Sequence, residues 1–151
     1  MEGKKEAQLP RDQSFGWLVA VLGGQMASSL DEKLKKIGIS LSLWPSLFAL
    51  WEEEGLTQVE LAARCNTANY TTTRVLDSLE ALGLVERKKH PTSRRAYQIF
   101  LTDKGRELEA AGVQMATECN EDYLSALSEV ERSQIHELIK KVISARDSRS
   151  I

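Results

Sequence analysis

The stretch over residues 55–105 constrains the fold of this 151-residue chain more than any other part of its sequence. It opens with the pattern Thr57-x-x-Glu60, a capping box in which the two side chains satisfy free backbone amides at a helix start. Asn66 then predicts a turn, since asparagine tolerates a left-handed backbone better than most residues. A second helix is predicted over about residues 67–82, and its inward stripe comprises Thr72, Val75, Leu76, Leu79 and Leu82.

Two short strands are predicted after Gly83 ends that helix, over residues 84–89 and 96–101, around a basic loop at 90–95. This order of helix, turn, helix, strand, loop and strand is typical of a winged helix-turn-helix, whose second helix fits the major groove of duplex DNA. We therefore predict a mainly α fold with a small β wing (α+β) and a DNA-binding lobe over residues 38–101.

The charge distribution favours a polyanionic partner, although the net charge of the chain is −2. Residues 57–101 hold seven lysine and arginine side chains against four acidic ones, so this segment carries +3 and the remainder −5. A basic face on an acidic body is the electrostatic pattern expected of a DNA-binding protein.

The outward side of the 67–82 helix carries polar side chains that can bond to base edges or phosphates. Bidentate arginine or asparagine contacts discriminate between bases by about 1–3 kcal/mol each. On composition alone a solvated helix face is the commoner interpretation, but the turn before the helix and the wing after it favour DNA contact. The candidate base-reading residues are Asn69, Tyr70, Thr71, Thr73 and Arg74.

Basic side chains also flank the predicted wing tip, in the run 87–90 and in the pair at 94–95. A charge run is usually only a solvated loop. On a hairpin beside a groove-bound helix, however, such cations would meet phosphates or enter the minor groove. The candidate wing contacts are Lys88, Lys89, Arg94 and Arg95.

Apolar helices are predicted on both sides of the lobe, over 13–37 and 102–147, after a flexible arm at 1–12. They carry more apolar residues than the lobe can cover, so we expect them to pack together and against a second copy of the chain. Two recognition helices about one DNA turn apart would then read the half-sites of an inverted repeat. The stripes are Phe15, Leu18, Val19, Leu22, Met26, Leu30 and Leu34 in the first helix, and Ile135, Leu138, Ile139, Val142 and Ile143 in the last.

Further details of these helices are predicted from capping residues and glycines. The pair Gly23-Gly24 predicts a bend or a close approach in the first helix, which Gly38 ends. A helix over about 43–54 has Ser42 as its expected cap and buries Trp44, Leu47, Phe48 and Trp51. Thr102 is expected to cap one long helix with Leu108, Gly112, Met115 and Cys119 in register, and Ser128 and Glu131 form a second capping box.

The central stretch resembles the MarR family, the multiple-antibiotic-resistance-type regulators of bacteria and archaea. The resemblance implies an obligate dimer whose N- and C-terminal helices interlock. It also implies a protein that usually represses genes and releases DNA when a small phenolic ligand, an oxidant or a metal acts on it. The segments that carry it are Leu56–Ala62, Thr73–Glu80, Gly83–Arg87, Arg94–Arg95 and Leu101–Gly105.

The sequence departs from the family pattern at the wing and at the turn. Members typically have Asp-x-Arg in the wing, and Ser93 occupies the acidic position here, before Arg94 and Arg95. Because the acid helps to fix the wing arginine in the family, we expect a looser wing or one steadied by a hydroxyl. Cys65 and Asn66 replace a usual hydrophobic residue and a usual glycine, and neither changes the fold expected.

A ligand cleft between the dimer helices and the winged lobe is also implied by the resemblance. Phe15 and the candidates Trp17, Trp44, Phe48 and Trp51 could line an aromatic pocket there. Aromatic residues at helical spacing are more often simply core. Trp17 lies off the apolar stripe of its helix and is the better candidate for a pocket or an interface.

Catalytic, metal and cofactor sites are not predicted. No glycine-rich phosphate loop, nucleophile constellation or metal motif is present, so the chain is not expected to be an enzyme. His90 and His136 have no nearby ligand cluster, and no metal or cofactor is expected. Cys65 replaces a core leucine, and acidic neighbours should raise the pKa of Cys119, which disfavours thiolate chemistry at both.

The leading hypothesis is a cytoplasmic, sequence-specific regulator of transcription, a predicted repressor that binds duplex DNA as a homodimer and is released by a small aromatic ligand. No apolar run is long enough to cross a bilayer, and the cysteine content suits a reducing compartment. Two alternatives remain: a winged-helix protein-interaction module without DNA affinity, and a redox-responsive regulator that uses Cys65 or Cys119.

Overall fold

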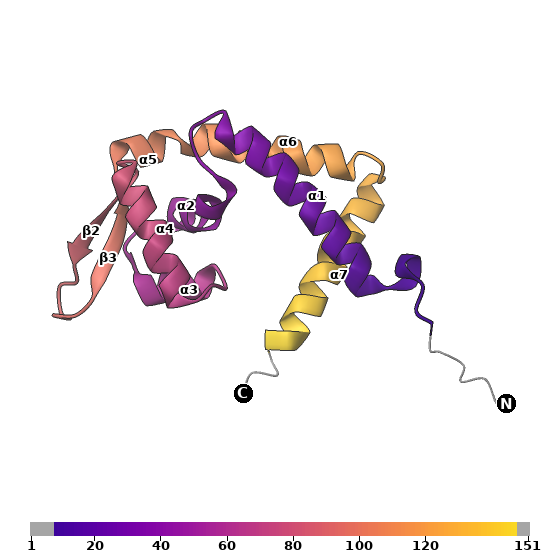
Figure 1. Cartoon of the computed structure of the whole chain (residues 1–151), viewed down its shortest axis with the longest axis horizontal. Helices are drawn as coiled ribbons and strands as arrows, with labels where there is room; N and C mark the ends of the chain where they lie inside the picture. The colour runs from indigo at the N-terminus through magenta and orange to yellow at the C-terminus, as the bar shows by residue number, and fades with distance from the viewer. Residues whose placement is uncertain (1–7, 148–151) are drawn as a thin grey trace. The chain divides into compact units, whose positions relative to one another are not determined.

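The computed structural model describes residues 8–147, which fall into two compact units divided between Ala116 and Thr117. Ten elements belong wholly to the first unit (Figure 1): η1 (Arg11–Gln13), α1 (Phe15–Lys35), η2 (Leu41–Leu43), α2 (Trp44–Glu52), β1 (Leu56–Thr57), α3 (Gln58–Arg64), α4 (Asn69–Ala81), β2 (Val85–Lys89), β3 (Tyr97–Leu101) and α5 (Asp103–Glu107). The helix α6 (Glu109–Leu124) crosses the division, and α7 (Glu129–Asp147) lies in the second unit. The predicted arm at 1–12 lies mostly outside the described residues.

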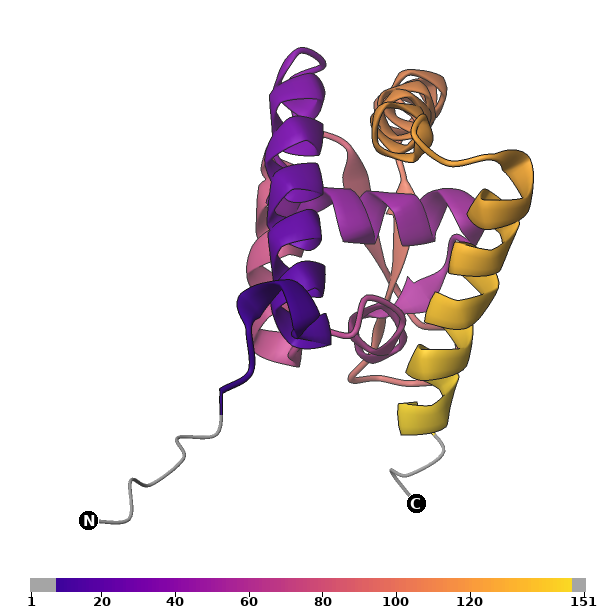
Figure 2. The same cartoon turned by 90° about the vertical axis from the view of Figure 1, so that its right-hand side faces the viewer.

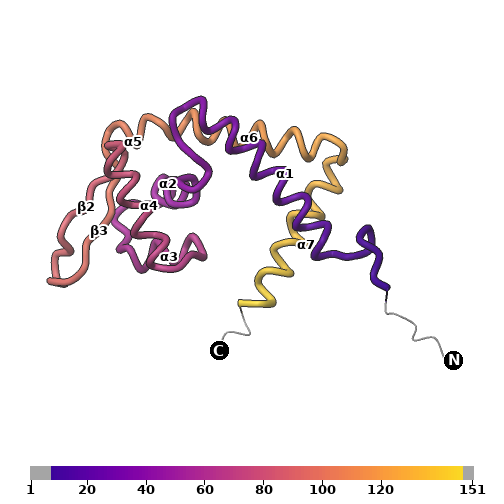
Figure 3. The backbone as a smooth tube through the Cα atoms, in the orientation of Figure 1, coloured from indigo at the N-terminus to yellow at the C-terminus, as the bar shows by residue number. Residues whose placement is uncertain are grey.

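The three strands form one antiparallel sheet in the order β1-β3-β2, so β3 is central. Its register places Arg87 opposite Ile99 and Lys89 opposite Tyr97. The smooth trace in Figure 3 shows the β2–β3 hairpin at the edge of the group formed by α2, α3 and α4. A mainly helical chain with a small β wing is therefore confirmed. The sequence analysis did not predict β1, because two residues are too few to show an alternating pattern.

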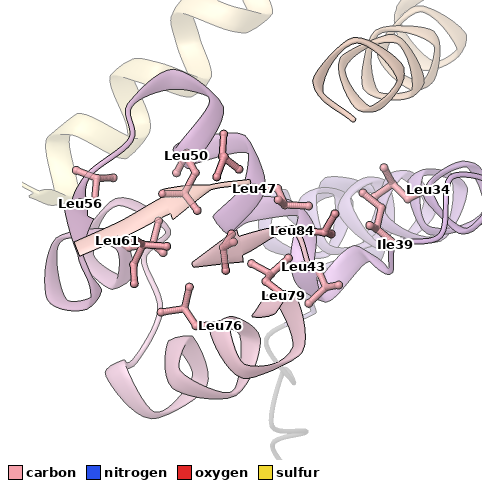
Figure 4. Close-up of a cluster of buried hydrophobic side chains, with 14 residues drawn as sticks. Leu34, Ile39, Leu43, Leu47, Leu50, Leu56, Leu61, Leu76, Leu79 and Leu84 are labelled. Atoms are coloured by element: carbon pink, nitrogen blue, oxygen red, sulfur yellow. The ribbon is translucent and has the colours of Figure 1, made fainter. Parts of the chain in front are cut away.

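A leucine-rich core holds α2, α3, α4 and the sheet together (Figure 4). The predicted stripe of α4 is buried at Thr72, Leu76 and Leu79, and Val75 is half-buried. The inward placement of Leu82 is wrong, since 39% of this residue is exposed. The helix ends there, and Leu84 continues the buried side instead. The largest fully buried side chains are Leu34, Leu47, Leu50, Leu61, Leu76, Leu79, Leu84 and Ile99.

The start of α2 differs from the prediction. Ser42 does not cap the helix, because it lies inside the preceding 3-10 turn, where its hydroxyl shares a 2.8 Å hydrogen bond with the Ser40 hydroxyl. Leu41 N–H donates instead to Asp31 Oδ1 at 2.9 Å, which joins this turn to α1. Phe48 is not buried as expected, since 43% of it is exposed. The buried side of α2 carries Ser46, Leu47, Ala49 and Leu50.

The segment after Thr102 is two helices rather than one. The Thr102 hydroxyl caps α5 as expected by accepting from the Gly105 amide at 3.1 Å, but the helix breaks at Leu108. Gly105 is required here, because a Cβ at this position would overlap the Leu84 carbonyl oxygen. The Gly105 carbonyl accepts from Trp51 Nε1 at 3.0 Å. A contact between residues 54 apart in the chain thus accompanies the break, and no local pattern indicates it.

The terminal helices expose their apolar stripes in the single chain. The helix α1 runs without interruption from Phe15 to Lys35 (Figure 2), so Gly23 and Gly24 do not break it. A Cβ at either glycine would meet no atom of the described residues within 4 Å. Of the α1 stripe only Leu34 is buried, and α7 has no buried residue over Glu129–Asp147. The inward placement of the α7 stripe is therefore wrong for one chain. The most exposed stripe residues are Phe15, Leu18, Val19, Leu138, Val142 and Ile143.

Candidate nucleic-acid interface

The turn between α3 and α4 fixes the angle at which α4 leaves the lobe. Asn66 adopts the left-handed backbone expected, with φ of 51°. Thr67 N–H donates to the Ala62 carbonyl at 2.9 Å, and the hydroxyls of Thr67 and Thr72 lie 3.0 Å apart. Because Thr72 is only 2% exposed, this hydroxyl pair anchors the start of α4 inside the lobe. The predicted capping box at the start of α3 is also confirmed, by reciprocal Thr57 and Glu60 hydrogen bonds.

The outward side of α4 exposes four of its five candidate base-reading residues. Asn69, Tyr70, Thr71 and Arg74 are exposed, and the Arg74 guanidinium carbon lies 5.2 Å from the centre of the Tyr70 ring. A cation over a ring face is attracted by the negative potential of that face. This contact favours an arginine conformation that lies along the helix surface.

Thr73 occupies a different environment. It is half-buried, and its hydroxyl donates to the Asn69 carbonyl at 3.0 Å while accepting from Gln58 Nε2 at 2.6 Å. Gln58 also donates to the Asn69 carbonyl at 3.3 Å, so the first residue of α3 braces the first turn of α4. The sequence analysis missed Gln58, because a contact across 15 residues has no local signature.

The wing places all four of its candidate cations at the surface. Lys88, Lys89, Arg94 and Arg95 are all exposed. Lys88 Nζ lies 3.0 Å from a Glu86 carboxylate oxygen and 4.8 Å from the centre of the Phe100 ring. Its charge is therefore partly compensated, whereas Lys89 and Arg94 line a surface hollow at the wing tip.

Arg87 ties the wing to α4. Its guanidinium pairs with Asp77 at 3.0 Å and, through its other terminal nitrogen, with Glu80, both on α4. The arginine side chain is 22% exposed, so solvent screens this pair less than a fully exposed one. Sequence analysis placed Arg87 in the basic run of the wing. In the structure, Arg87 instead links β2 to α4 through these ion pairs.

The wing tip is a turn built around His90. The Nδ1 atom of His90 accepts from the backbone amides of Thr92 and Ser93, both at 3.2 Å, and the Thr92 hydroxyl lies 3.3 Å away. The His90 amide in turn donates to the Ala96 carbonyl at 3.0 Å, which closes the hairpin. A ring nitrogen with the Thr92 hydroxyl beside it therefore steadies the loop that contains Ser93.

The base of the wing is joined to α2 and α5 through Glu54. Its carboxylate accepts from the Leu101 amide at 2.7 Å and from Arg106 at 2.9 Å. Burial by itself would raise the pKa of Glu54, but the hydrogen bonds from Arg106 and Leu101 outweigh burial and lower it. Glu54 is therefore held as a carboxylate that fixes the end of β3.

Comparisons with known proteins agree on this arrangement. Residues 39–97 match the family model described as the MarR family. The transcriptional repressor MprA of Escherichia coli K12 is 28% identical over 125 residues, which cover 82% of this chain and 71% of that protein. The crystal structure of a MarR transcriptional regulator from Methanosarcina mazei Go1 is similar with a TM-score of 0.84 and 26% identity, over 88% of this chain and 96% of that one.

The third comparison bears on the partner. The chain is similar to MepR of Staphylococcus aureus, solved in complex with DNA, with a TM-score of 0.81 and 26% identity over 87% of this chain and 98% of that one. Residues 39–97 of this chain form a MarR-family domain. It is a winged-helix, DNA-binding regulator of transcription, and the resemblance that its central stretch indicated is confirmed.

The candidate effector residues of this MarR-family chain divide into two places. Trp44 stacks on Phe48 with ring centres 5.2 Å apart and meets Trp51 edge-on at 5.6 Å. A Cβ at Gly112 would lie 2.7 Å from Trp51 Cη2, so the absence of a side chain there makes room for the rings. Trp17, on α1, is 46% exposed and has the Arg11 guanidinium over its ring.

The two cysteines of this MarR-family chain differ in environment. Cys119 is buried, and Cys65 is half-buried with its sulfur 4.0 Å from the Ser46 hydroxyl. Burial raises the pKa of the Cys65 thiol, which disfavours the reactive thiolate. Over residues 8–147, no group of three or more histidine, cysteine or acidic side chains is placed to hold a metal ion. Nor does this part of the chain contain a helix long and apolar enough to span a membrane.

Proposed function

We propose that this MarR-family regulator is a repressor that binds an inverted-repeat operator as a homodimer and is released by a small aromatic ligand. The observation that carries the DNA-reading part is the exposed side of α4, where Arg74 lies over Tyr70 beside a basic wing. A bidentate arginine contact to guanine is the commonest specific contact in the major groove. The amide end of α4 adds to this, because its N-cap, Ala68, supplies no side-chain acceptor to the first-turn amides.

The homodimer is supported by the exposed apolar stripes of α1 and α7. Phe15, Leu18 and Val19 each have about half or more of their surface in contact with solvent in the single chain, as do Val142 and Ile143. Apolar surface of this extent on a helix face marks an interface. A two-fold axis through such an interface would present two copies of α4 to successive major grooves, which is the geometry that reads an inverted repeat.

Separate observations support repression and release by a ligand. MprA, to which the chain is similar over most of its length, is named a transcriptional repressor. Trp44 stacks on Phe48 and meets Trp51 edge-on, with both tryptophans close to Gly112, and such rings would bind an aromatic ligand by stacking. The raised pKa of the Cys65 thiol disfavours the redox alternative.

The experiment that tests this proposal is selection of bound sequences from a random duplex pool, followed by sedimentation of the protein on the winning sequence. We expect an inverted repeat with half-site centres about 10 bp apart, or a multiple of that spacing, bound by two chains. Failure to enrich any sequence, with no duplex binding at low salt, would favour the protein-interaction module. A single unrepeated site bound by one chain would overturn the dimer.

Arg74→Ala in the same selection tests the reading residue. Loss of a bidentate base contact should relax the preference at one position of each half-site by about 1–3 kcal/mol. Lys89→Ala is the matched control, because a phosphate contact should weaken all sequences alike. An unchanged consensus for Arg74→Ala would remove this arginine from the reading set.

A further inference from the structure

The ring of His90 stabilises the turn at the wing tip by accepting backbone hydrogen bonds. Asparagine and aspartate often form such turns, in which the side-chain oxygen accepts the amide two residues on. His90 Nδ1 stands at the same number of bonds from the backbone as that oxygen. It accepts both the Thr92 and the Ser93 amide, each at 3.2 Å.

This geometry specifies the chemical state of the ring. Nδ1 can accept these amides only when it carries no proton, so the ring must be neutral with its hydrogen on Nε2. In a protonated ring both nitrogens carry hydrogen, so Nδ1–H would point at the Thr92 and Ser93 N–H groups and could accept neither. The charged groups around the ring are Lys89 and Arg94, which line the same hollow, and Glu60 on α3, whose pKa a positive charge on His90 would lower.

The two residues that follow the turn are the wing arginines. Arg94 and Arg95 come directly after Ser93, whose amide is one of those held by the ring. The bond from the His90 amide to the Ala96 carbonyl closes the other side, so the arginine pair lies between two fixed points. Backbone held in one conformation loses less entropy when its side chains bind, which increases affinity.

We propose that neutral His90 is the positioning residue of the wing: it fixes the 90–93 turn and so aims Arg94 and Arg95 at DNA phosphates. This inference rests on the proposed DNA-binding function for its consequence, but not for its geometry. His90 acts through the backbone and makes no contact with DNA in this role.

The first test uses the full-length protein without DNA. Long-range ¹H–¹⁵N NMR at pH 8 should show an unprotonated Nδ1 and a protonated Nε2 for His90. The Thr92 and Ser93 amides should be protected from hydrogen exchange in the parent and in His90→Asn, and unprotected in His90→Ala. A ring with its hydrogen on Nδ1 at pH 8, or amides equally protected in His90→Ala, would overturn the proposal.

The second test measures binding of a fluorescent duplex of mixed sequence at pH 8 over a series of salt concentrations. His90→Ala should bind about three- to tenfold more weakly, the worth of two modest hydrogen bonds, with a shallower salt dependence. His90→Asn should restore binding to within about twofold, because asparagine forms the same turn. Arg94→Ala with Arg95→Ala provides the reference for loss of both wing contacts.

The outcomes separate positioning from direct contact. If the histidine acts by placing its own charge on a phosphate, His90→Ala will match the parent at pH 8, and that result overturns the proposal. An asparagine variant as weak as the alanine variant also overturns it. A parent protein that binds no duplex at low salt would remove the DNA-binding function, while the NMR test would still decide the role of His90. Equal thermal unfolding temperatures for the parent, His90→Ala and His90→Asn would show that the substitutions at the wing tip leave the fold intact.

Discussion

The winged lobe buries its apolar side chains within one chain, whereas the terminal helices expose theirs. In the lobe, Leu47, Leu76 and Ile99 have no exposed surface, because three helices and a sheet enclose them. In α1 and α7, residues of the same type lie exposed along a helix face in the single chain. The apolar core of the lobe is thus closed within one chain, whereas the terminal helices leave apolar surface exposed. Variants should therefore be able to change the stability of the lobe and the association of chains separately.

The largest expected effect comes from deleting a buried leucine of the lobe. Leu79→Ala should lower the free energy of unfolding by about 2–5 kcal/mol, because Leu79 is fully buried and the cavity cannot close completely. Denaturant unfolding measures it, at several protein concentrations. The same change at Leu138 of α7, which is 61% exposed, is the matched control.

Leu138→Ala should act through association, so its effect should depend on protein concentration, while that of Leu79→Ala should not. If both variants lose stability equally at every concentration, the contrast between a closed lobe and open terminal helices is wrong.

The next effect separates two glycines by the space around them. Gly105→Ala should destabilise by about 1–3 kcal/mol or more, since the added methyl overlaps the Leu84 carbonyl oxygen. Gly23→Ala, in open space on α1, should instead stabilise the isolated helix by up to about 1 kcal/mol. Thermal unfolding of the two variants should shift in opposite directions. A weaker dimer in Gly23→Ala, seen by sedimentation, would mean that the partner copy closely approaches this glycine.

A smaller effect is expected at the link between wing and recognition helix. Arg87→Met should loosen β2 from α4 at a cost of about 1 kcal/mol, because it removes a partly buried pair with Asp77 and Glu80. Hydrogen exchange of the β2 amides should quicken. Lys88→Met removes the same charge from the next residue, whose pair with Glu86 is on its own strand. Equal exchange rates in the two variants would argue against a structural role for Arg87.

The smallest effect is expected from acid titration of the two capping boxes, one in the lobe and one in α7. Hydrogen bonds from Thr57 and from Ser128 lower the pKa of Glu60 and of Glu131, respectively. A carboxyl whose pKa is lower in the folded state stabilises the fold above its unfolded pKa of about 4.3, and this stabilisation is lost as the pH falls through the folded value. Glu60→Gln and Glu131→Gln should therefore be less stable than the parent at pH 7 and converge on it near pH 3.

Convergence measured by thermal unfolding would support both boxes. A difference that grows as the pH falls has the wrong sign and would contradict the assignment.

Local patterns predicted the parts of the fold that local interactions determine. The capping boxes, the left-handed Asn66 and the two wing strands follow from residues within a few positions of one another. The failures lie where distant residues decide. Trp51 meets Gly105 across 54 residues, and Gln58 engages Thr73 across 15.

The candidate site shows the same division. Exposure of Asn69, Tyr70, Thr71 and Arg74 followed from helical spacing. Helical spacing and charge did not predict the role of Arg87 or the turn around His90. A cation that faces solvent and one that links two elements look the same in the sequence. Which residues contact DNA remains a prediction until binding is measured.

The pairing of Arg87 with α4 has a consequence for how the protein could be switched. Because Asp77 and Glu80 pair with Arg87 of β2, a displacement of α4 would be transmitted to the wing. Under the proposed function, such a movement would weaken groove contacts and phosphate contacts together.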